Sequence, residues 1–317
     1  MSPLGDVVYF GGEYVPLSRA MVPITTNAFN YGTGCFEGIR AYWNEEQEEL
    51  YALLLPEHME RMVRSARILK LDLTMDAGDL TGIALELLRR NEYRCDAYIR
   101  PIAYKSGSTI KVALTGIATD LCMYTIPMGD YLDTAKGLDL TVSAWRRIED
   151  NAIPARAKPT GAYINAAMAS DEARVAGFDE ALMLTSDGHV AEAASSNLFL
   201  VVNDRLVTPE AVDDILEGIT RAAVLSLGEA LEIPTESRRI DRSELYAADE
   251  VFLCGTGVQI APVSTIDGRA IGTGKPGPVT MHLQTEYLSM VRGRSRLFPE
   301  WRTPVYERVS ARFRDPL

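Results

Sequence analysis

The sequence predicts a two-domain protein of the mixed α+β and α/β class. A chain of 317 residues is long enough for two domains of ordinary size, each with its own hydrophobic core. Hydrophobic residues make up 47% of the chain and charged residues 24%, a balance typical of a folded globular protein. In the second half, strand-length apolar segments alternate with helix-length segments, which indicates an α/β arrangement there.

The first 55 residues have the pattern of β structure. Segments 7–10 and 13–15 flank a pair of glycines, and such a pair between two short apolar segments is typical of a tight hairpin turn. Segments 39–43 and 50–54 flank a short polar stretch in the same way. We therefore predict two β-hairpins in this part of the chain.

Two helices and three strands are predicted next. The first helix begins at Pro56, because proline suits the first position of a helix, and the second covers residues 76–91. Apolar side chains on one face of the first helix indicate that it packs on a core: Met59, Met62, Val63, Ala66 and Leu69. The strands are expected at 97–104, 119–127 and 138–145.

Periodicity is lost over residues 128–137, and we place the connection between the domains there. Residues 1–128 would form a smaller N-terminal domain, 129–137 the linker, and 138–317 a larger C-terminal domain. The C-terminal helices are predicted at 162–177, 219–231 and 278–291, and the strands at 180–184, 197–202 and 249–253.

Charge and hydropathy exclude several classes of partner. A formal charge of −12 disfavours nucleic acid, since no basic face could dominate such a field. The longest apolar stretches, 50–55 and 198–202, have the length of strands and are too short to cross a bilayer. The N-terminus has neither the basic start nor the apolar run of a signal peptide. We therefore expect a cytoplasmic protein without a nucleic-acid or membrane partner.

Cysteine and histidine give no sign of a disulfide framework or a metal. The four cysteines lie far apart and include no C-x-x-C pair, so we expect reduced thiols. The three histidines are not spaced for metal ligation, and no calcium-loop or H-E-x-x-H pattern occurs. The sequence predicts no metal site.

Two residues are candidates for chemistry. Lys158 lies among small and apolar neighbours that could bury its amine. Burial lowers the proton affinity of an amine, and an amine must be unprotonated to attack a carbonyl near neutral pH. Glu192 precedes an apolar strand, where a carboxylate could pair with a protonated pyridine nitrogen. Taken alone, each fits a simpler interpretation better: a partly exposed lysine before a helix, and a solvated glutamate in a turn.

Two turns have the composition of anion sites. Residues 216–221, L-E-G-I-T-R, open a helix, where backbone N–H groups and the Thr220 hydroxyl could bind a phosphate. Residues 255–258, G-T-G-V, offer a similar turn after a strand. Residues 272–277 match the letters of the dinucleotide motif G-x-G-x-x-G, but they lie too near the C-terminus for the rest of a Rossmann half to follow.

Nine segments, spread over nearly the whole chain, carry a family resemblance: NAFNYGTGCFEGIRAY (27–42), LPEHMERMVRSARIL (55–69), AYIRPI (97–102), AKPTGAYIN (157–165), EARVAGFDEALML (172–184), AEAASSNLFLV (191–201), LEGITR (216–221), ADEVFLCGTGVQIAPV (248–263) and VRGRSRLFPEW (291–301). Together they resemble the branched-chain amino acid aminotransferases, within class IV of the pyridoxal-phosphate enzymes. The resemblance implies the two-domain architecture of fold type IV, which is like that of D-amino acid aminotransferase. A smaller N-terminal α/β domain would precede a larger C-terminal α/β pseudo-barrel domain.

The resemblance implies pyridoxal 5'-phosphate as the cofactor and assigns a group to each part of it. Lys158 would carry the cofactor covalently and move a proton between it and the substrate α-carbon. Glu192 would bind the pyridine nitrogen, and Tyr163 the phenolic oxygen. The phosphate would be bound by Arg61, the Ile219 and Thr220 amides, and Thr256.

The resemblance also implies one pocket for two kinds of side chain. Tyr98 and the turn that contains Thr256, Gly257 and Val258 would bind the substrate α-carboxylate. The side-chain carboxylate of glutamate would be held by Tyr31 and Arg100. The pocket for aliphatic side chains would be lined by Phe36, Met128 and Tyr131, with Arg40 either supporting this wall or serving only the fold.

Departures from the family pattern leave two substrate classes open. After Glu192 the family commonly has G-x-G-x-N, whereas this chain has A-A-S-S-N, which looks more like the D-amino acid branch. Met128 stands where an aromatic residue is frequent, and loop 105–113 is not the usual glycine-rich one. We expect a homodimeric transaminase for branched-chain-type L-amino acids with 2-oxoglutarate and glutamate, which the retained Tyr31, Tyr98 and Arg100 favour. The alternative is a class IV transaminase for D-amino acids or (R)-amines.

Overall fold

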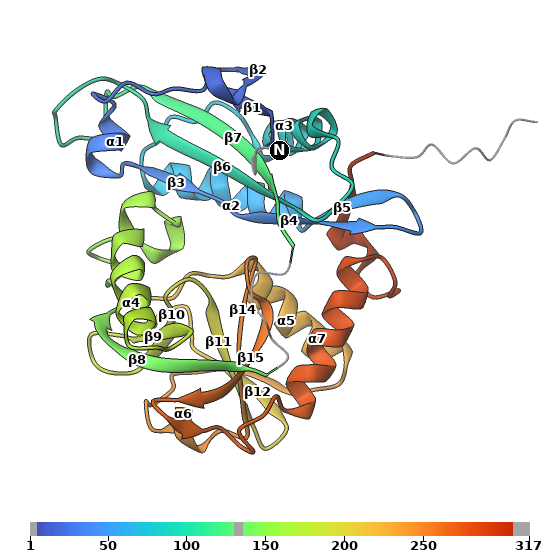
Figure 1. Ribbon diagram of the computed structural model, residues 1–317. Coiled ribbons are helices and arrows are strands. Elements are labelled where there is room, and N and C mark those ends of the chain that lie inside the picture. Colours follow the sequence, from blue (N-terminus) through green and yellow to red (C-terminus); the bar gives the residue numbers. More distant parts are fainter. Residues whose placement is uncertain (1–4, 130–135, 307–317) are drawn as a thin grey trace, which may run out of the picture.

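The computed structural model describes residues 5–129 and 136–306, and it contains two β-sheets with helices packed against each (Figure 1). The first sheet is antiparallel and occupies the upper half of Figure 1. Its strands run in the order β17 (Arg302–Pro304), β5 (Glu49–Leu53), β4 (Ile39–Asn44), β6 (Ala97–Lys105), β7 (Thr119–Pro127), β1 (Val7–Phe10) and β2 (Glu13–Pro16), and β3 (Gly34–Phe36) also pairs with β6.

Two long helices cover the core of this first sheet. Helix α2 (Leu55–Ile68) buries Met59, Met62 and Ala66 in it, as the periodicity predicted. Helix α3 (Ala77–Asn91) begins at a capping box, in which the Asp76 and Asp79 side chains each accept a hydrogen bond from the other residue's backbone N–H. The remaining helical segments of this half are α1 (Asn27–Tyr31) and the short 3-10 turn Leu17–Arg19.

The second sheet mixes parallel and antiparallel pairs. Strand β8 is parallel to both its neighbours, β9 and β15, and β12 is parallel to β13. The order is β10 (Val190–Ala193), β9 (Glu180–Leu184), β8 (Leu138–Arg146), β15 (Gln259–Ile266), β14 (Glu250–Gly255), β11 (Asn197–Val202), β12 (Arg205–Thr208) and β13 (Thr235–Ser237), and β16 (Arg269–Ala270) also pairs with β15.

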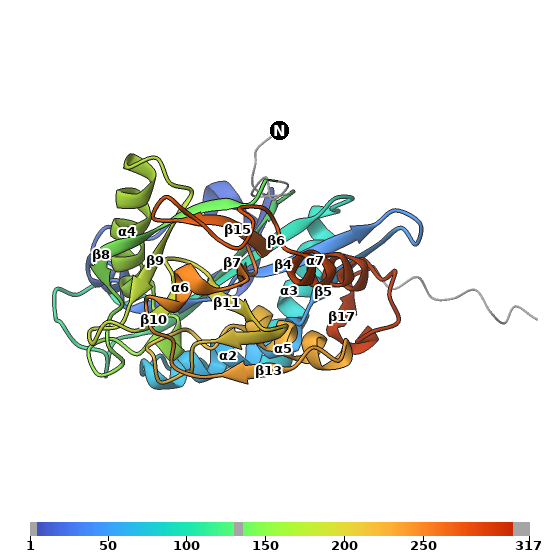
Figure 2. The ribbon, with the colours of Figure 1, turned by 90° about the horizontal axis from the view of Figure 1, so that it is seen from below.

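This second sheet curls on itself. Leu182 and Val190, near one end of the strand order, share a core with Leu198 and Val207, near the other end, which a flat sheet could not bring together. The result is the open barrel that the fold type IV resemblance implied (Figure 2). Its helices are α4 (Tyr163–Val175) on β8 and β9, α5 (Ile219–Ala230) and α7 (Pro278–Val291) on β14 and β15, and the short α6 (Glu244–Ala247).

Most elements predicted from the sequence are confirmed to within a few residues, including both hairpins and all five long helices. The prediction of β structure throughout the first 55 residues is wrong at α1, a single turn that ends at Gly32 in the left-handed conformation. Strands β10, β12, β13, β15, β16 and β17 were not predicted. Strand β10 carries Glu192 and β15 carries Pro262, and a charge or a proline inside a short segment weakens the strand pattern.

The last described strand returns to the first sheet. Strand β17 pairs with β5, and the Val305 side chain is buried in the core of the first sheet. A division of the chain by sheets would therefore assign residues 302–306 to the N-terminal half. The predicted boundaries at 128 and 137 stay a prediction, since Tyr131 and the rest of 130–135 lie outside the described residues.

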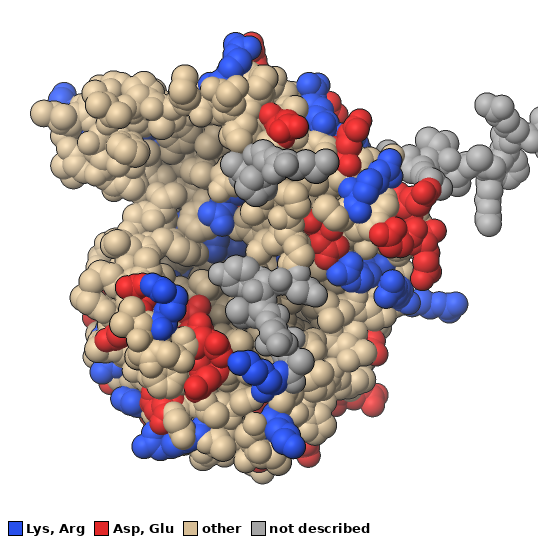
Figure 3. Space-filling model, viewed as in Figure 1, with Lys and Arg blue, Asp and Glu red and all other residues tan. Residues whose placement is uncertain are grey.

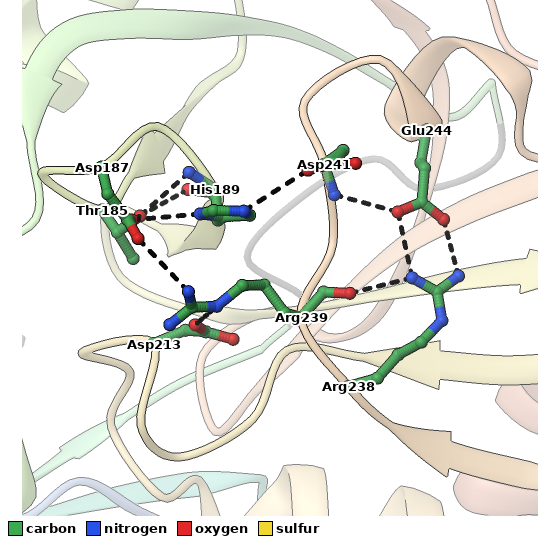
Figure 4. A network of polar contacts seen from close by, with 8 residues as sticks. All are labelled: Thr185, Asp187, His189, Asp213, Arg238, Arg239, Asp241 and Glu244. Atoms are coloured by element: carbon green, nitrogen blue, oxygen red, sulfur yellow. Dashed lines mark hydrogen bonds and ion pairs between the residues drawn. The ribbon is translucent and has the colours of Figure 1, made fainter.

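A polar network holds the edge strand β10 in place (Figure 4). The His189 ring lies between two carboxylates, 3.1 Å from Asp187 Oδ1 and 3.4 Å from Asp241 Oδ1. Close by, Arg238 forms a two-pronged ion pair with Glu244. The Val190 N–H then donates to Ile240 O at 2.9 Å, so the segment before α6 fixes the start of the strand that carries Glu192.

Within residues 5–129 and 136–306, no helix has the length and apolar character needed to span a membrane. No group of His, Cys, Asp and Glu side chains in the same ranges could hold a metal ion. All four cysteines lie in the described part of the chain and are free thiols.

Candidate active site

A cavity of about 370 Å³ lies at the junction of the two sheets. Figure 3 shows a hollow between the two halves of the molecule, with basic side chains at its bottom. Thirteen of the fifteen site residues expected from the sequence line the cavity: Phe36, Arg61, Tyr98, Arg100, Met128, Lys158, Tyr163, Glu192, Ile219, Thr220, Thr256, Gly257 and Val258. Of the other two, Tyr131 is outside the described residues, and Tyr31 lies elsewhere.

Lys158 sits between two 3-10 turns, Ala155–Ala157 and Thr160–Ala162, with its backbone in the left-handed region at φ 42°. This conformation is costly for a residue other than glycine, so the surrounding contacts must hold it. Its carbonyl accepts from the Phe36 N–H at 3.3 Å, and its Nζ donates to Tyr163 Oη at 2.8 Å. The amine therefore lies in the cavity, and its hydrogen bond to the Tyr163 hydroxyl fixes the direction in which it points.

The segment after Lys158 is packed directly on the first half of the chain. A Cβ on Gly32 would lie only 2.7 Å from the Gly161 Cα, so the two backbones approach as closely as glycines allow. The Thr160 hydroxyl interacts with two carbonyl oxygens, at 2.7 Å from Gly32 O and 3.1 Å from Gly34 O. These contacts place the lysine of the second half against strand β3 of the first.

Glu192 is buried in strand β10, so the interpretation of a solvated turn glutamate is wrong. Its carboxylate accepts from Asn197 Nδ2 at 2.8 Å and from the Leu216 N–H at 3.2 Å, and it forms an ion pair with Arg147 at 2.7 Å. Burial raises the pKa of Glu192 above its ordinary value, and Arg147 is the strongest of the groups that oppose this.

Arg61 is also buried, although it belongs to helix α2. Its guanidinium binds Glu37 by two hydrogen bonds, at 2.6 and 2.8 Å, and donates to Glu217 O at 2.8 Å. Although burial alone would raise it, the pKa of Glu37 is held below its ordinary value by Arg61 and His58. Burial lowers the pKa of His58, whose Nδ1 donates to Glu37 Oε2 at 2.8 Å.

The N-terminus of α5 provides backbone donors next to Arg61. Its first residue is preceded by Gly218, and none of the described side chains caps the helix there, which leaves the first N–H groups available to a ligand. A Cβ on Gly218 would lie 1.9 Å from Asn197 Oδ1, so any other residue here would displace the Asn197 side chain. Ser196 lines the same cavity, and its buried hydroxyl has no hydrogen-bond partner in the described part of the chain.

These features fit a phosphorylated pyridine aldehyde. The amine of Lys158 lies within the cavity, a buried carboxylate is available for a ring nitrogen, and helix α5 with Arg61 and an unpartnered hydroxyl suits a phosphate.

Arg100 lies on the other side of the cavity. Its guanidinium donates to Tyr98 Oη, at 2.6 Å from Nη2, and stacks over the Phe36 ring at 4.4 Å from the centroid. Among the described residues it has no ion pair with a carboxylate, so its charge is available to a ligand. Burial raises the pKa of the Tyr98 hydroxyl, which keeps its proton and can donate it in a hydrogen bond.

Arg40 joins parts of the cavity wall that are distant in the sequence. It is almost fully buried and donates to Met128 O at 3.0 Å, to Gly257 O at 3.3 Å, and to Gly129 O. Strand β4 is thereby tied to the end of β7 and to the turn after β14.

Tyr31 does not line this cavity. It lies at the end of α1, is 40% exposed, and donates its hydroxyl proton to Ile110 O at 2.7 Å. Conversely, Arg147 lines the cavity but was not predicted as a site residue. No sequence motif contains both Arg147 and Glu192, so the sequence offered no reason to select it. Asn197 could have been selected, since it ends the motif that begins at Glu192.

This fold and this cavity have counterparts among known proteins. Residues 34–266 match the family model for amino-transferase class IV. A probable branched-chain-amino-acid aminotransferase of Aquifex aeolicus is 47% identical over 96% of this chain and 98% of its own. The branched-chain amino acid aminotransferase from Thermobaculum terrenum, in PLP form, has a TM-score of 0.92 and 35% identity, and the match covers 96% of this chain and 99% of that one. The branched-chain aminotransferase from the archaeon Thermoproteus uzoniensis, with norvaline, has a TM-score of 0.91 at 42% identity, over 95% of this chain and 99% of that one.

The antiparallel sheet, the open barrel and the lysine between them define a fold type IV enzyme, and the chain belongs to the class IV aminotransferases. Within that class it is a member of the branched-chain amino acid aminotransferase family, because the similarity extends over nearly the full length of both chains.

Glu37→Gln should destabilise the protein by about 3 kcal/mol, because it leaves the Arg61 guanidinium buried without its counter-charge. Since the pKa of Glu37 is lowered in the folded state, its contribution is complete above the ordinary glutamate value of about 4.3 and declines as the pH falls below it. The free energy of unfolding in urea should therefore differ between the variant and wild type by a constant amount from pH 8 down to about pH 4. Between about pH 4 and pH 3 this difference should become smaller. Glu57→Gln, at an exposed position of α2, is the control. A difference that does not change with pH would contradict the buried pair.

Proposed function

We propose that this chain is a pyridoxal-phosphate-dependent transaminase that exchanges amino groups between branched-chain-type L-amino acids and 2-oxoglutarate. The observation that carries the proposal is the single cavity in which Lys158, Glu192 and the start of α5 meet Arg100 and an apolar wall. One side of it suits the cofactor and the other suits the substrate.

The cofactor side has a donor or acceptor for each part of pyridoxal phosphate. When bound, the cofactor supplies a conjugated ring that can accept the electron pair of the substrate Cα–H bond. Lys158 would hold it covalently, and the Lys158 Nζ would take the α-proton and return it. Glu192 would balance the charge on the ring nitrogen, and Tyr163 would bind the phenolic oxygen. Arg61, the Ile219 and Thr220 amides, and Thr256 would hold the phosphate.

The substrate side must accept two unlike side chains in turn. Tyr98, Gly257 and Val258 would bind the α-carboxylate that both substrates share. Phe36 and Met128 provide apolar surface for a leucine or valine side chain. Arg100, stacked over Phe36 and without a carboxylate partner in the described residues, would bind the second carboxylate of glutamate.

Lys158→Ala should abolish covalent attachment of the cofactor. Wild-type protein mixed with pyridoxal phosphate should be yellow, and borohydride should remove the colour and fix the cofactor to Lys158, as peptide mass spectrometry would show. The matched control is Lys275→Ala, at an exposed lysine, which should behave as wild type. A reducible adduct in the Lys158→Ala protein would identify another lysine as the carrier.

Arg100→Leu should separate the two substrates. The loss in kcat/KM for glutamate and 2-oxoglutarate should be about 2–4 kcal/mol, the effect of removing a charged hydrogen bond from a desolvated site. The single-turnover reaction with L-leucine, followed by the cofactor absorbance, should change much less.

Two results would count against this assignment of substrates. Equal loss in both half-reactions, with a lower Tm, would mean that Arg100 serves only the fold. Turnover with D-leucine or an (R)-amine in preference to L-leucine would favour the alternative class.

A homodimer is the second part of the proposal. Segments 21–31 and 108–112 are joined by hydrogen bonds and expose apolar side chains on one protrusion of the first half. Large exposed apolar patches are rare on monomers, so we assign this patch to contact with a second copy, whose cavity Tyr31 would then reach. The patch contains Met21, Val22, Ile24, Phe29, Tyr31, Ile110 and Val112.

Ile110→Asp should convert a dimer into a monomer in sedimentation velocity, because an unpaired carboxylate is costly to bury. Val212→Asp places the same charge on an exposed valine outside this patch and should leave the dimer intact. A wild-type monomer, or a dimer that tolerates Ile110→Asp, would contradict the assignment.

A cytoplasmic location is the third part of the proposal, because four free thiols would remain reduced in that compartment.

A further inference from the structure

Arg147 forms an ion pair with Glu192 in the wall of the cavity. The Nη2 atom of Arg147 lies 2.7 Å from Glu192 Oε1, and the two side chains are only 12% and 6% exposed. Arg147 is itself fixed at two other points, since its backbone N–H donates to Leu184 O at 2.8 Å and its Nε donates to Asp214 O at 3.1 Å. The guanidinium is therefore held in one position against the carboxylate.

The other donors to Glu192 are neutral. Asn197 Nδ2 donates to Oε2 at 2.8 Å and is fixed by a second bond to Leu216 O at 2.9 Å. The Leu216 N–H lies 3.2 Å from both carboxylate oxygens. These groups orient the carboxylate, but Arg147 is the only full positive charge in hydrogen-bond contact with it among the described residues. Because a carboxylate has about four lone-pair sites, room remains on it for a further N–H donor.

A buried carboxylate without a counter-charge takes up a proton more readily. Burial raises the pKa of Glu192, and Arg147 is the largest influence in the opposite direction. If Glu192 were protonated, it could no longer balance a positive charge on a ring nitrogen. The remaining titratable groups around it are Lys158, Arg221, Arg61 and the thiol of Cys254.

We propose that Arg147 is a positioning residue that keeps Glu192 ionised and aimed at the ring nitrogen of the cofactor. It acts on the reaction through Glu192 and does not touch the substrate. The inference rests on the proposed function, because it assigns Arg147 a part in the same site.

The direct readout is the protonation of the cofactor ring. Pyridoxal phosphate labelled with ¹⁵N at the ring nitrogen should show a protonated nitrogen in the wild-type enzyme at neutral pH. In Arg147→Met, the nitrogen should lose its proton, and the acidic limb of the kcat profile should move to higher pH by about 1–3 units, the effect of an adjacent opposite charge on a carboxyl group. Glu192→Gln gives the reference shift for a nitrogen without a carboxylate partner.

Two further variants separate charge from packing. Arg147→Lys keeps the charge and should shift the profile less than Arg147→Met. Arg174→Met removes an arginine that pairs with Asp171 at the surface and is 73% exposed, and it should leave both the ¹⁵N signal and the profile unchanged. If Arg147→Met does not fold, Arg147→Gln gives the same test with a polar neutral side chain.

The inference is overturned if Arg147→Met retains a protonated ring nitrogen and a wild-type pH profile. It is equally overturned if activity falls by one factor at every pH together with Tm, since that result indicates a structural role alone. A raised KM for substrates with an unchanged ¹⁵N signal would instead assign Arg147 to substrate binding. Failure of the wild-type protein to bind pyridoxal phosphate would refute the proposed function, whereas wild-type binding with an unaffected variant would refute only this inference.

Discussion

Charged side chains lie out of water at the junction of the two sheets, and they are stable there because they are paired. Glu37 holds Arg61 by two hydrogen bonds, and Arg147 holds Glu192. Each of the four would be costly to bury alone, whereas a pair with further hydrogen bonds offsets the desolvation of both partners. The two pairs fix the positions of Arg61 and Glu192, and each side chain still has hydrogen-bonding capacity for a ligand in the cavity.

The charges of the cavity and of the whole protein have opposite signs. The chain carries a formal charge of −12, yet the cavity lining includes Arg61, Arg100, Arg147 and Lys158 against Glu192. Basic side chains appear within the hollow in Figure 3, and acidic ones lie on the surface around it. A concave basic site of this kind concentrates anions, and a phosphate and two carboxylates are the groups that the proposed reaction brings to it.

The junction also explains how distant segments act together. Lys158 belongs to the second half of the chain, but its carbonyl accepts from Phe36 of the first, and Gly161 lies against Gly32. Arg40 of β4 binds the backbone of Met128 and Gly257, one on each side of the connection between the halves. A change in the relative position of the sheets would therefore alter the cofactor side and the substrate side at the same time.

Periodicity, turn residues and colinear motifs are properties of neighbouring residues, so the sequence was enough to predict the local elements and the family. It predicted helices α2 and α3, both hairpins, and Lys158 with Glu192 as candidates. The partners of each charge, in contrast, are known only from the packed molecule. Arg147 is far from Glu192 in the chain, Tyr31 lies outside the cavity, and β17 returns to the first sheet. These relations depend on the packing of one sheet against another, for which a single sequence carries no local signal.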